Sequence, residues 1–279
     1  MIDPEMKKMG YLQNLHTHST FDHGIDTPEE MIGEAIRKGF DSVGFSGHSY
    51  LLCAAEFTMS EAGTEKYKKE ILRLKKEYAK RIKIYLGLEL DMLSDTPVGG
   101  YDYLIGSMHY IKMGEDLVGV DRDAEYCQKA IREYFGGNGL EFAKEYFRQI
   151  TLLPQRADID ILAHFDLIAK HVDRVNVFDC HGREYLSAAV EALEALRKDI
   201  SFFEINTGGM ARGFRKTPYP MPDILKEMRR LGFGAVITSD CHDARLLDFG
   251  FDEAAALLKA AGFKEKYVLT AAGFQPTAL

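Results

Sequence analysis

Short apolar stretches alternate with amphipathic segments along the whole chain. Seven stretches, mostly four to six apolar or β-favouring residues long, have the character of strands buried in a parallel sheet; they span residues 11–16, 41–48, 82–89, 101–109, 159–164, 201–206 and 234–240. Helical periodicity marks the segments between them, at residues 27–39, 65–81, 123–134, 140–157, 182–198, 222–231 and 251–261. Thr27, Pro28 and Glu30 predict the start of the first helix, as a capping box with proline in the first turn.

This alternation predicts βα units and a parallel sheet. Seven units suit a closed or nearly closed barrel better than an open sheet, although the pattern alone leaves the open sheet possible. We find no Pro-, Gly- or Ser-rich linker and no low-complexity tract or short-period repeat, so we expect residues 1–279 to form a single α/β domain.

Composition and charge narrow the class of protein. With 46% hydrophobic and 28% charged residues, the chain is neither collagen-like nor disordered. No apolar run approaches the ~20 residues of a membrane span, and the opening residues lack a secretory-signal pattern. Four separated cysteines without a CxxC pair fit a reduced compartment, so we expect a cytoplasmic protein that does not bind a membrane. The net charge of −8 disfavours a nucleic-acid partner, and the oligomeric state stays open.

Metal-type ligands follow six of the seven predicted strands. They are His16 and His18, then His48, Glu89, His109 and His164, and finally Asp240 with His242. In a βα barrel, the carboxyl ends of the strands converge on one face, where active sites are built. The HTH and DCH spacings place two ligands on one side of an extended chain, and a carboxylate can bridge two cations. Imidazole mixed with carboxylate suits Zn²⁺, Mn²⁺ or Fe²⁺.

The motifs NLHTHSTFDHG, FSGH, GLELD, IGSMH, ILAHFDLI, FEINT and TSDCH occur in this order between residues 14 and 242. With them the chain resembles the PHP (polymerase and histidinol phosphatase) family, and within it the monofunctional histidinol-phosphate phosphatases. The resemblance implies a distorted (β/α)7 barrel with the metal site at the carboxyl ends of the strands, and three divalent ions that are Zn, Mn or Fe. The implied ligand sets are His16, His18, Glu89 and Asp240 for one ion, Glu89, His109 and His164 for a second, and His23, His48 and His242 for a third.

The chain departs from many relatives at Gly47, where they carry an acid before the histidine. The departure predicts an altered affinity of the third ion. His171 and His181 are left outside the ligand sets. The cysteine between Asp240 and His242 is interpreted as an ordinary thiol.

The implied activity is hydrolysis of a phosphate monoester, most specifically L-histidinol phosphate, by direct attack of a metal-bound hydroxide. We find no P-loop, no GxSxG elbow and no Cys-Arg phosphatase loop, which agrees with attack by water. Asp240 and His242 are the candidate catalytic residues for proton transfer. Arg212 and Arg215, in the Gly-rich loop after the sixth strand, and Lys170 are the candidate substrate-binding cations, because arginine matches phosphate oxygens in pairs.

Three alternatives remain at this point. A PHP-type phosphoesterase can act on another small phosphate or on nucleotides. Amidohydrolase-type C–N hydrolases also begin with HxH on a first strand, although they usually carry a bridging group on the fourth strand, whereas the acid here is on the third. The third alternative is a metal-binding protein without enzymatic activity. Residues 49–63 can form either a lid over the site or a plain packed connection.

Overall fold

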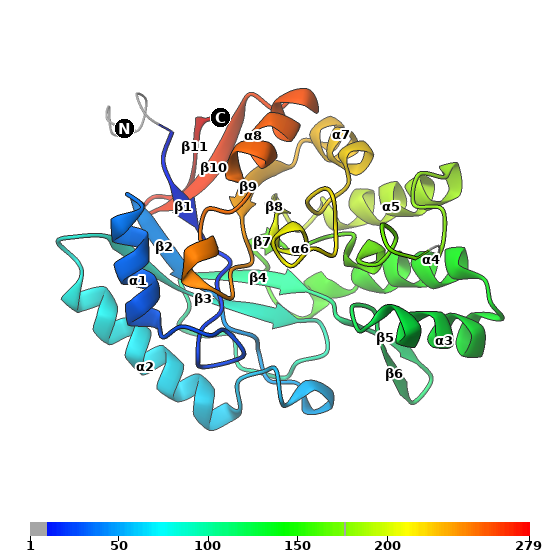
Figure 1. The fold of residues 1–279 in the computed structure, drawn as a ribbon, viewed down its shortest axis with the longest axis horizontal. Helices are drawn as coiled ribbons and strands as arrows, with labels where there is room; N and C mark the ends of the chain where they lie inside the picture. Colours follow the sequence, from blue (N-terminus) through cyan, green and yellow to red (C-terminus); the bar gives the residue numbers. More distant parts are fainter. Residues whose placement is uncertain (1–9, 176) are drawn as a thin grey trace.

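A single sheet of seven parallel strands organises the computed structural model, which describes residues 10–175 and 177–279 (Figure 1). The strand order is β1-β2-β3-β4-β7-β8-β9. The strands are β1 (Gln13–Asn14), β2 (Ser42–Phe45), β3 (Lys83–Asp91), β4 (Tyr103–Ser107), β7 (Ile161–Leu162), β8 (Phe202–Asn206) and β9 (Gly234–Thr238). All seven predicted strands are confirmed, although β1 and β7 are shorter than expected.

The two edge strands meet and close the sheet into a distorted barrel. His18 N donates to Cys241 O at 2.8 Å, and Cys241 N donates to His16 O at 3.1 Å. This closure lies just beyond the ends of β1 and β9, at the level of the predicted ligands. At the opposite end, the side chain of Gln13 bonds to both backbone groups of Leu269, so a C-terminal strand seals the barrel from below.

Tyr103 fills the barrel interior. Its hydroxyl donates to Leu15 O at 2.5 Å, and its ring occupies the space beside Gly44 and Gly87. A Cβ atom at either glycine would lie within 2.3 Å of Tyr103 atoms, so both positions require glycine for close packing. This interior packing forms a floor beneath the carboxyl ends of the strands, and a larger apolar core lies between the sheet and the helices.

The helices lie outside the sheet (Figure 1). They are α1 (Pro28–Arg37), α2 (Glu61–Glu77), α3 (Ala124–Phe135), α4 (Gly139–Ile150), α5 (Arg183–Leu196), the short α6 (Gly208–Ala211), α7 (Pro222–Leu231) and α8 (Phe251–Ala260). The predicted capping box of Thr27 and Glu30 is confirmed. The helix α2 begins four residues earlier than expected because Ser60 caps it, and α4 ends before Pro154, which starts a 3₁₀ turn.

Two antiparallel hairpins were not expected from the sequence. The first consists of β5 (Tyr110–Met113) and β6 (Asp116–Gly119), directly after β4. The second consists of β10 (Glu265–Thr270) and β11 (Gly273–Ala278) at the end of the chain. The first hairpin leads into the loop that carries Asp121, and the second closes the bottom of the barrel.

None of the described helices is long and apolar enough to cross a membrane. Residues 1–9, on which the expectation about a secretory signal partly rests, lie outside the described residues. The single-domain prediction stays a prediction, which the participation of β9 in the same sheet as β1 supports.

Candidate metal centre

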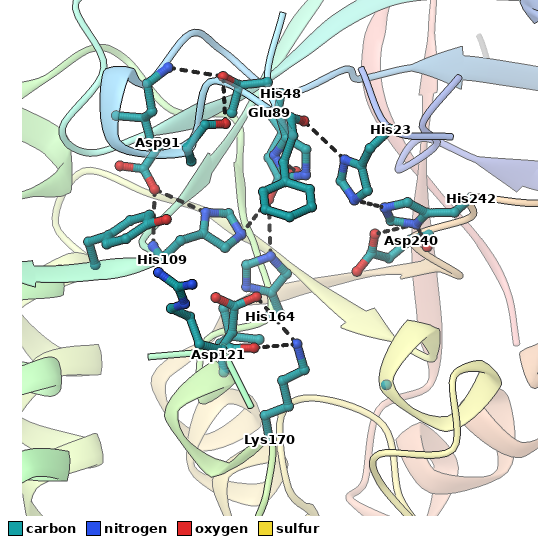
Figure 2. A pocket seen from close by; sticks show the side chains of 18 of the residues that line it. His23, His48, Glu89, Asp91, His109, Asp121, His164, Lys170, Asp240 and His242 are labelled. Atoms are coloured by element: carbon teal, nitrogen blue, oxygen red, sulfur yellow. Dashed lines mark hydrogen bonds and ion pairs between the residues drawn. The ribbon is translucent and has the colours of Figure 1, made fainter. Parts of the chain in front are cut away.

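All nine predicted metal ligands converge at the carboxyl ends of the strands. Figure 2 shows seven of them, without His16 and His18. Glu89 lies within β3, seven others follow strand ends by a few residues, and His23 lies further along the loop between β1 and α1. The parallel sheet brings these ends to one face, so residues more than 200 positions apart become neighbours. We call His16, His18, Glu89, His109, His164 and Asp240 the inner group, and His23, His48 and His242 the outer group.

Glu89 is the centre of the inner group. Its carboxylate oxygens lie 3.2 Å from His16 Nε2, 3.5 Å from His18 Nε2, 2.8 Å from His48 Nδ1, 3.5 Å from His109 Nε2 and 3.0 Å from His164 Nε2. Asp240 Oδ1 lies 3.2 Å from His18 Nε2 and 3.7 Å from His16 Nε2. Two carboxylates are therefore surrounded by imidazole nitrogens of five histidines, which come from four different strand ends.

The inner group has the chemistry of a cation site. His16 Nε2, His18 Nε2 and Glu89 Oε2 are buried and make no hydrogen bond. Burial acts to lower the pKa of His16, but the carboxylates of Glu204 and Glu89 outweigh it and raise that pKa well above its usual value. Burial likewise acts to raise the pKa of Glu89, and the surrounding imidazoles hold it well below the usual value. The site thus favours added positive charge, which protons or metal ions can supply.

Three carboxylates that the sequence analysis did not single out orient the inner histidines. Glu204 accepts a hydrogen bond from His16 Nδ1 at 2.8 Å, Asp22 from His18 Nδ1 at 2.6 Å, and Asp91 from His109 Nδ1 at 3.0 Å. Each bond leaves the Nε2 atom of its histidine facing the centre. Such carboxylates fix the ring and raise its basicity as a metal ligand.

The same carboxylates change the balance of charge in the centre. Burial acts to lower the pKa of His18, but Asp22 outweighs it and the pKa rises to about 9. For His109, Asp91 and Glu89 overcome burial in the same way and raise the pKa to about 9. Asp22 and Asp91 lie inside the motifs STFDHG and GLELD, within a few residues of a ligand, which was the signal available in the sequence. Glu204 lies in FEINT, a motif without a ligand, and had no such signal.

The expected gap at Gly47 is filled by Asp22. Asp22 Oδ2 accepts from His48 N at 3.0 Å as well as from His18 Nδ1. A Cβ atom at Gly47 would lie 3.4 Å from Asp22 Oδ2 and 3.1 Å from Met59 Cε. The loop after β1 therefore supplies an acid beside the backbone of His48 although position 47 is glycine, and the altered affinity of the third ion stays a prediction.

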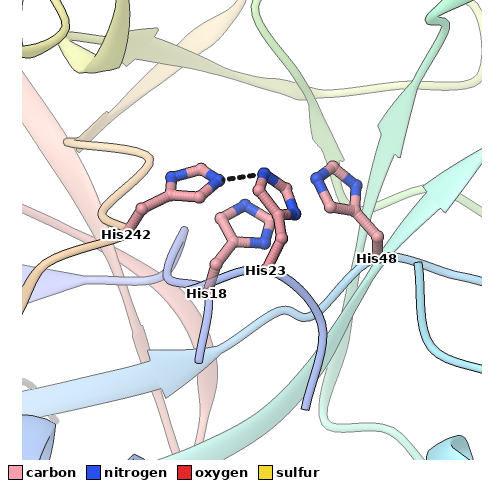
Figure 3. Close-up of side chains that lie close together, drawn as sticks. All are labelled: His18, His23, His48 and His242. Carbon is pink, nitrogen blue, oxygen red and sulfur yellow. Dashed lines mark hydrogen bonds between the residues drawn. The ribbon is translucent and has the colours of Figure 1, made fainter. Parts of the chain in front are cut away.

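The outer group is a stack of imidazoles beside His18 (Figure 3). The ring centroid of His18 lies 4.4 Å from that of His48 and 4.2 Å from that of His242. His23 Nε2 and His242 Nε2 are 2.7 Å apart. Burial and the neighbouring histidines lower the pKa of His23 to about 4. Burial also lowers the pKa of His48 and of His242, so the three outer rings favour the neutral form. One nitrogen from each of them and one from His18 lie within 4.8 Å of one another, as metal ligands do.

Backbone carbonyls orient two of the outer histidines. His23 Nδ1 donates to Phe57 O at 3.0 Å, and His242 Nδ1 lies 2.9 Å from Asp240 O. His48 turns its Nδ1 toward Glu89 instead, so His48 joins the outer group to the inner one. The grouping of donors therefore differs in detail from the three implied ligand sets, because His18 and His48 each lie near two of the clusters.

A cavity of about 490 Å³ opens above the donors. Arg212 and Lys170 both line it. Arg212 Nη2 donates to Asp240 Oδ2 at 2.9 Å, its Nη1 lies 3.0 Å from His242 Nδ1, and 35% of its side chain is exposed. Lys170 Nζ donates to Asp121 O at 2.6 Å (Figure 2).

Arg215 lies elsewhere, although sequence analysis placed it beside Arg212. Arg215 is 6% exposed and does not line the cavity. Its Nη1 donates to Ala169 O at 2.8 Å and its Nε to Asp173 at 3.1 Å. These bonds favour a structural role, in which Arg215 fastens the loop that carries Arg212, over the direct substrate contact that the sequence predicted.

The remaining candidates behave as ordinary residues. His171 is buried and bonds to Arg122 O through Nε2. Cys241 is buried, its thiol donates to Asp243 O at 2.8 Å, and burial raises its pKa to about 12. These contacts agree with the interpretation from the sequence that His171 is not a metal ligand and that Cys241 is an ordinary thiol. Part of residues 49–63 does line the cavity, as a 3₁₀ turn and loop before α2.

The chain matches the PHP domain model over residues 14–208, and it belongs to this family. A histidinol-phosphatase of Lactococcus lactis is 28% identical over 277 residues, with 93% of this chain and 93% of that protein covered. A histidinol phosphate phosphatase structure from the same species, in complex with zinc, L-histidinol and phosphate, gives a TM-score of 0.69 at 22% identity over 95% of this chain and 98% of that one. A candidate histidinol phosphatase from Listeria monocytogenes gives a TM-score of 0.75 at 22% identity over 86% and 99% of the two chains. The fold of these structures confirms the barrel predicted from the sequence.

Proposed function

We propose that this chain is a metal-dependent phosphate-monoester hydrolase that converts L-histidinol phosphate and water to L-histidinol and phosphate. One observation carries the proposal: nine imidazole and carboxylate donors converge beneath a cavity whose wall also carries a partly exposed arginine. Membership of the PHP family supports the reaction class. The relatives named histidinol-phosphatase, and the Lactococcus structure with L-histidinol and phosphate, support the substrate.

The donor set fits divalent cations. The buried donor atoms without hydrogen bonds, and the neutral imidazoles of the outer group, are the features of ligands arranged for ions. Three ions, of Zn, Mn or Fe, are our proposal for the full complement, with Glu89 shared between two of them. When bound, such ions lower the pKa of water towards ~7 and neutralise charge on phosphoryl oxygens.

Arg212 is the proposed phosphate-binding residue. Its guanidinium is held beside the donors by Asp240 and His242, yet it remains partly exposed in the cavity. A planar guanidinium can donate two parallel hydrogen bonds to phosphate oxygens. Lys170 adds a second cation to the same wall, and Arg215 positions the loop.

Asp240 and His242 are the proposed residues for proton transfer to the leaving oxygen of histidinol. Both line the cavity, Arg212 donates to Asp240 Oδ2, and its Nη1 lies 3.0 Å from His242 Nδ1. They therefore stand beside the proposed phosphate position, where the ester oxygen must acquire a proton as its bond to phosphorus breaks.

Phosphate release from wild-type protein with counted metals tests the proposal. L-Histidinol phosphate is compared with p-nitrophenyl phosphate, a mononucleotide and an oligonucleotide. We expect a kcat/KM for histidinol phosphate that exceeds the others by on the order of a hundredfold or more, because polar cavities reject analogues that leave their groups unpaired. The Glu89→Gln variant should fall to the background rate, while Glu115→Gln, on the exposed β5–β6 turn, should match wild type.

The other outcomes separate the alternatives. Weak and even activity on all monoesters would keep the hydrolase and remove histidinol phosphate as its substrate. Preference for the oligonucleotide would favour a nuclease. No phosphate release from metal-loaded protein would remove the phosphatase itself and reopen C–N hydrolysis or simple metal binding.

A further inference from the structure

The loop between β2 and α2 forms an apolar part of the cavity wall. We call residues 51–58 the cap segment. Six of its eight residues line the cavity, namely Leu51, Cys53, Ala54, Glu56, Phe57 and Thr58. The cap segment thereby adds apolar side chains to a cavity that is also lined by metal-type donors and by Arg212 and Lys170.

The cap segment is fixed by its own hydrogen bonds. Leu51 N donates to Thr58 Oγ1 at 3.2 Å, and Thr58 Oγ1 donates to Ala54 O at 3.2 Å. Phe57 N donates to Ala54 O at 2.9 Å, and Met59 N to His48 O at 3.2 Å. The last bond ties the end of the segment to the backbone of an outer-group histidine.

Phe57 connects the cap segment to the donors. Its carbonyl accepts the hydrogen bond from His23 Nδ1, and its ring stands at 79° to the His23 ring with centroids 5.7 Å apart. Phe57 nevertheless remains 51% exposed. Among the described residues, six large apolar side chains are exposed to a comparable extent, and Phe57 alone of these six lines the cavity. Its ring is therefore held at the edge of the centre with free surface beside the cavity.

The other aromatic residues of the wall have less surface to offer. Tyr219 is 1% exposed. Phe214 has Lys170 Nζ 4.6 Å and the Arg174 guanidinium 4.7 Å from its ring centroid, so cations already cover it. Tyr110 is half-buried on β5. Phe57 is the aromatic side chain of the wall that is best placed to accept a planar group.

We propose that Phe57 is a specificity-determining residue that packs against the imidazole ring of the substrate. The inference rests on the proposed function, since histidinol phosphate carries an aromatic ring at the end opposite its phosphate. With the phosphate beside Arg212 and the donors, that ring needs an apolar wall within the same cavity. Pairs of aromatic rings in offset or edge contact contribute enough for about a tenfold change in binding.

Steady-state kinetics of Phe57→Ala and Phe57→Tyr test the proposal, with Leu52→Ala as the matched control. Leu52 belongs to the same segment and is 81% exposed, but it does not line the cavity. We expect Phe57→Ala to raise KM for histidinol phosphate about tenfold with kcat nearly unchanged. The Ki of inorganic phosphate, KM for 2-aminoethyl phosphate (which has no ring) and the metal content should stay at wild-type values. Phe57→Tyr should keep the wild-type KM for histidinol phosphate, and Leu52→Ala should have no effect on it.

A second readout uses binding without turnover. Calorimetric titration of metal-loaded protein with L-histidinol should give an affinity about tenfold weaker in Phe57→Ala than in wild type. The proposal is overturned if Phe57→Ala lowers kcat or the metal content. It is also overturned if the variant weakens the binding of inorganic phosphate as much as the binding of histidinol, because Phe57 then acts only through His23. An equal effect of Leu52→Ala would overturn it as well. Wild-type kinetics are measured first, so a failure of the proposed function is seen separately on the unmodified protein.

Discussion

The inner and outer groups of the metal centre are oriented by different kinds of acceptor. Buried carboxylates hold three of the inner histidines through Nδ1, whereas backbone carbonyls hold His23 and His242. A carboxylate adds negative charge and makes the imidazole a stronger ligand, and a carbonyl adds far less. The pKa values follow this division, since that of His18 rises to about 9 and that of His23 falls to about 4. The inner group is therefore prepared for cations before any ion binds, whereas the orientation of His23 in the outer group depends on the loop that carries Phe57.

The largest effect is expected from breaking the inner side. Glu204 Oε2 accepts from His16 Nδ1 and from Thr238 Oγ1, and its Oε1 accepts from His164 N. Glu204→Gln replaces one acceptor with a donor inside a fully buried network. We expect metal affinity to fall about 10–100-fold and Tm to drop by roughly 3–10 °C. Equilibrium dialysis and thermal unfolding measure both, with exposed Glu191→Gln as the control.

An intermediate effect is expected on the outer side. His23→Ala removes a ligand and the bond to the cap segment, but it leaves the carboxylate-oriented histidines in place. We expect about one bound ion fewer per chain and a Tm within about 2 °C of wild type, because His23 is only half-buried. Metal counting and thermal unfolding check this. Loss of every ion from His23→Ala would show that the two groups bind as one unit and would end the distinction between them.

The smallest effect is expected at Arg212, which lies beside both groups. Arg212 donates to Asp240 of the inner group and lies beside His242 of the outer group, whereas Arg215 donates to Ala169 and Asp173. Lysine keeps the charge but loses the paired donors. Arg212→Lys should raise KM and the phosphate Ki about tenfold with Tm unchanged. Arg215→Lys should instead lower Tm by roughly 2–6 °C with a smaller change in KM. Reversed results would restore Arg215 as the phosphate ligand.

The repeated pattern in the chain was sufficient to predict a parallel sheet of seven strands and eight of the nine ligands, whereas the closed barrel and His23 were implied by the resemblance to the PHP family. Alternation of apolar stretches with amphipathic segments is a local property, and the parallel sheet that it predicts brings the strand ends together without further information. Glu89, His164 and Asp240 could therefore be assigned to one face from their position after a strand. Capping at Thr27 was equally local.

Long-range contacts decided the rest. Asp22 reaches the backbone of His48 across 26 positions, and Glu204 reaches His16 across 188 positions, so neither contact is encoded near the residue that it serves. The two hairpins depend on pairing and on the fit of Leu269 beneath Gln13.

Arg212 and Arg215 show the division most simply. They are three residues apart in one Gly-rich loop and cannot be told apart by composition or charge. The sequence by itself determined that eight metal-type donors lie at strand ends on one face of a parallel sheet, because that follows from local periodicity, and the resemblance to the PHP family added His23 and the closed barrel. Only the tertiary structure decided which acids orient the donors and which arginine faces the cavity, because burial and partners arise from packing between distant segments.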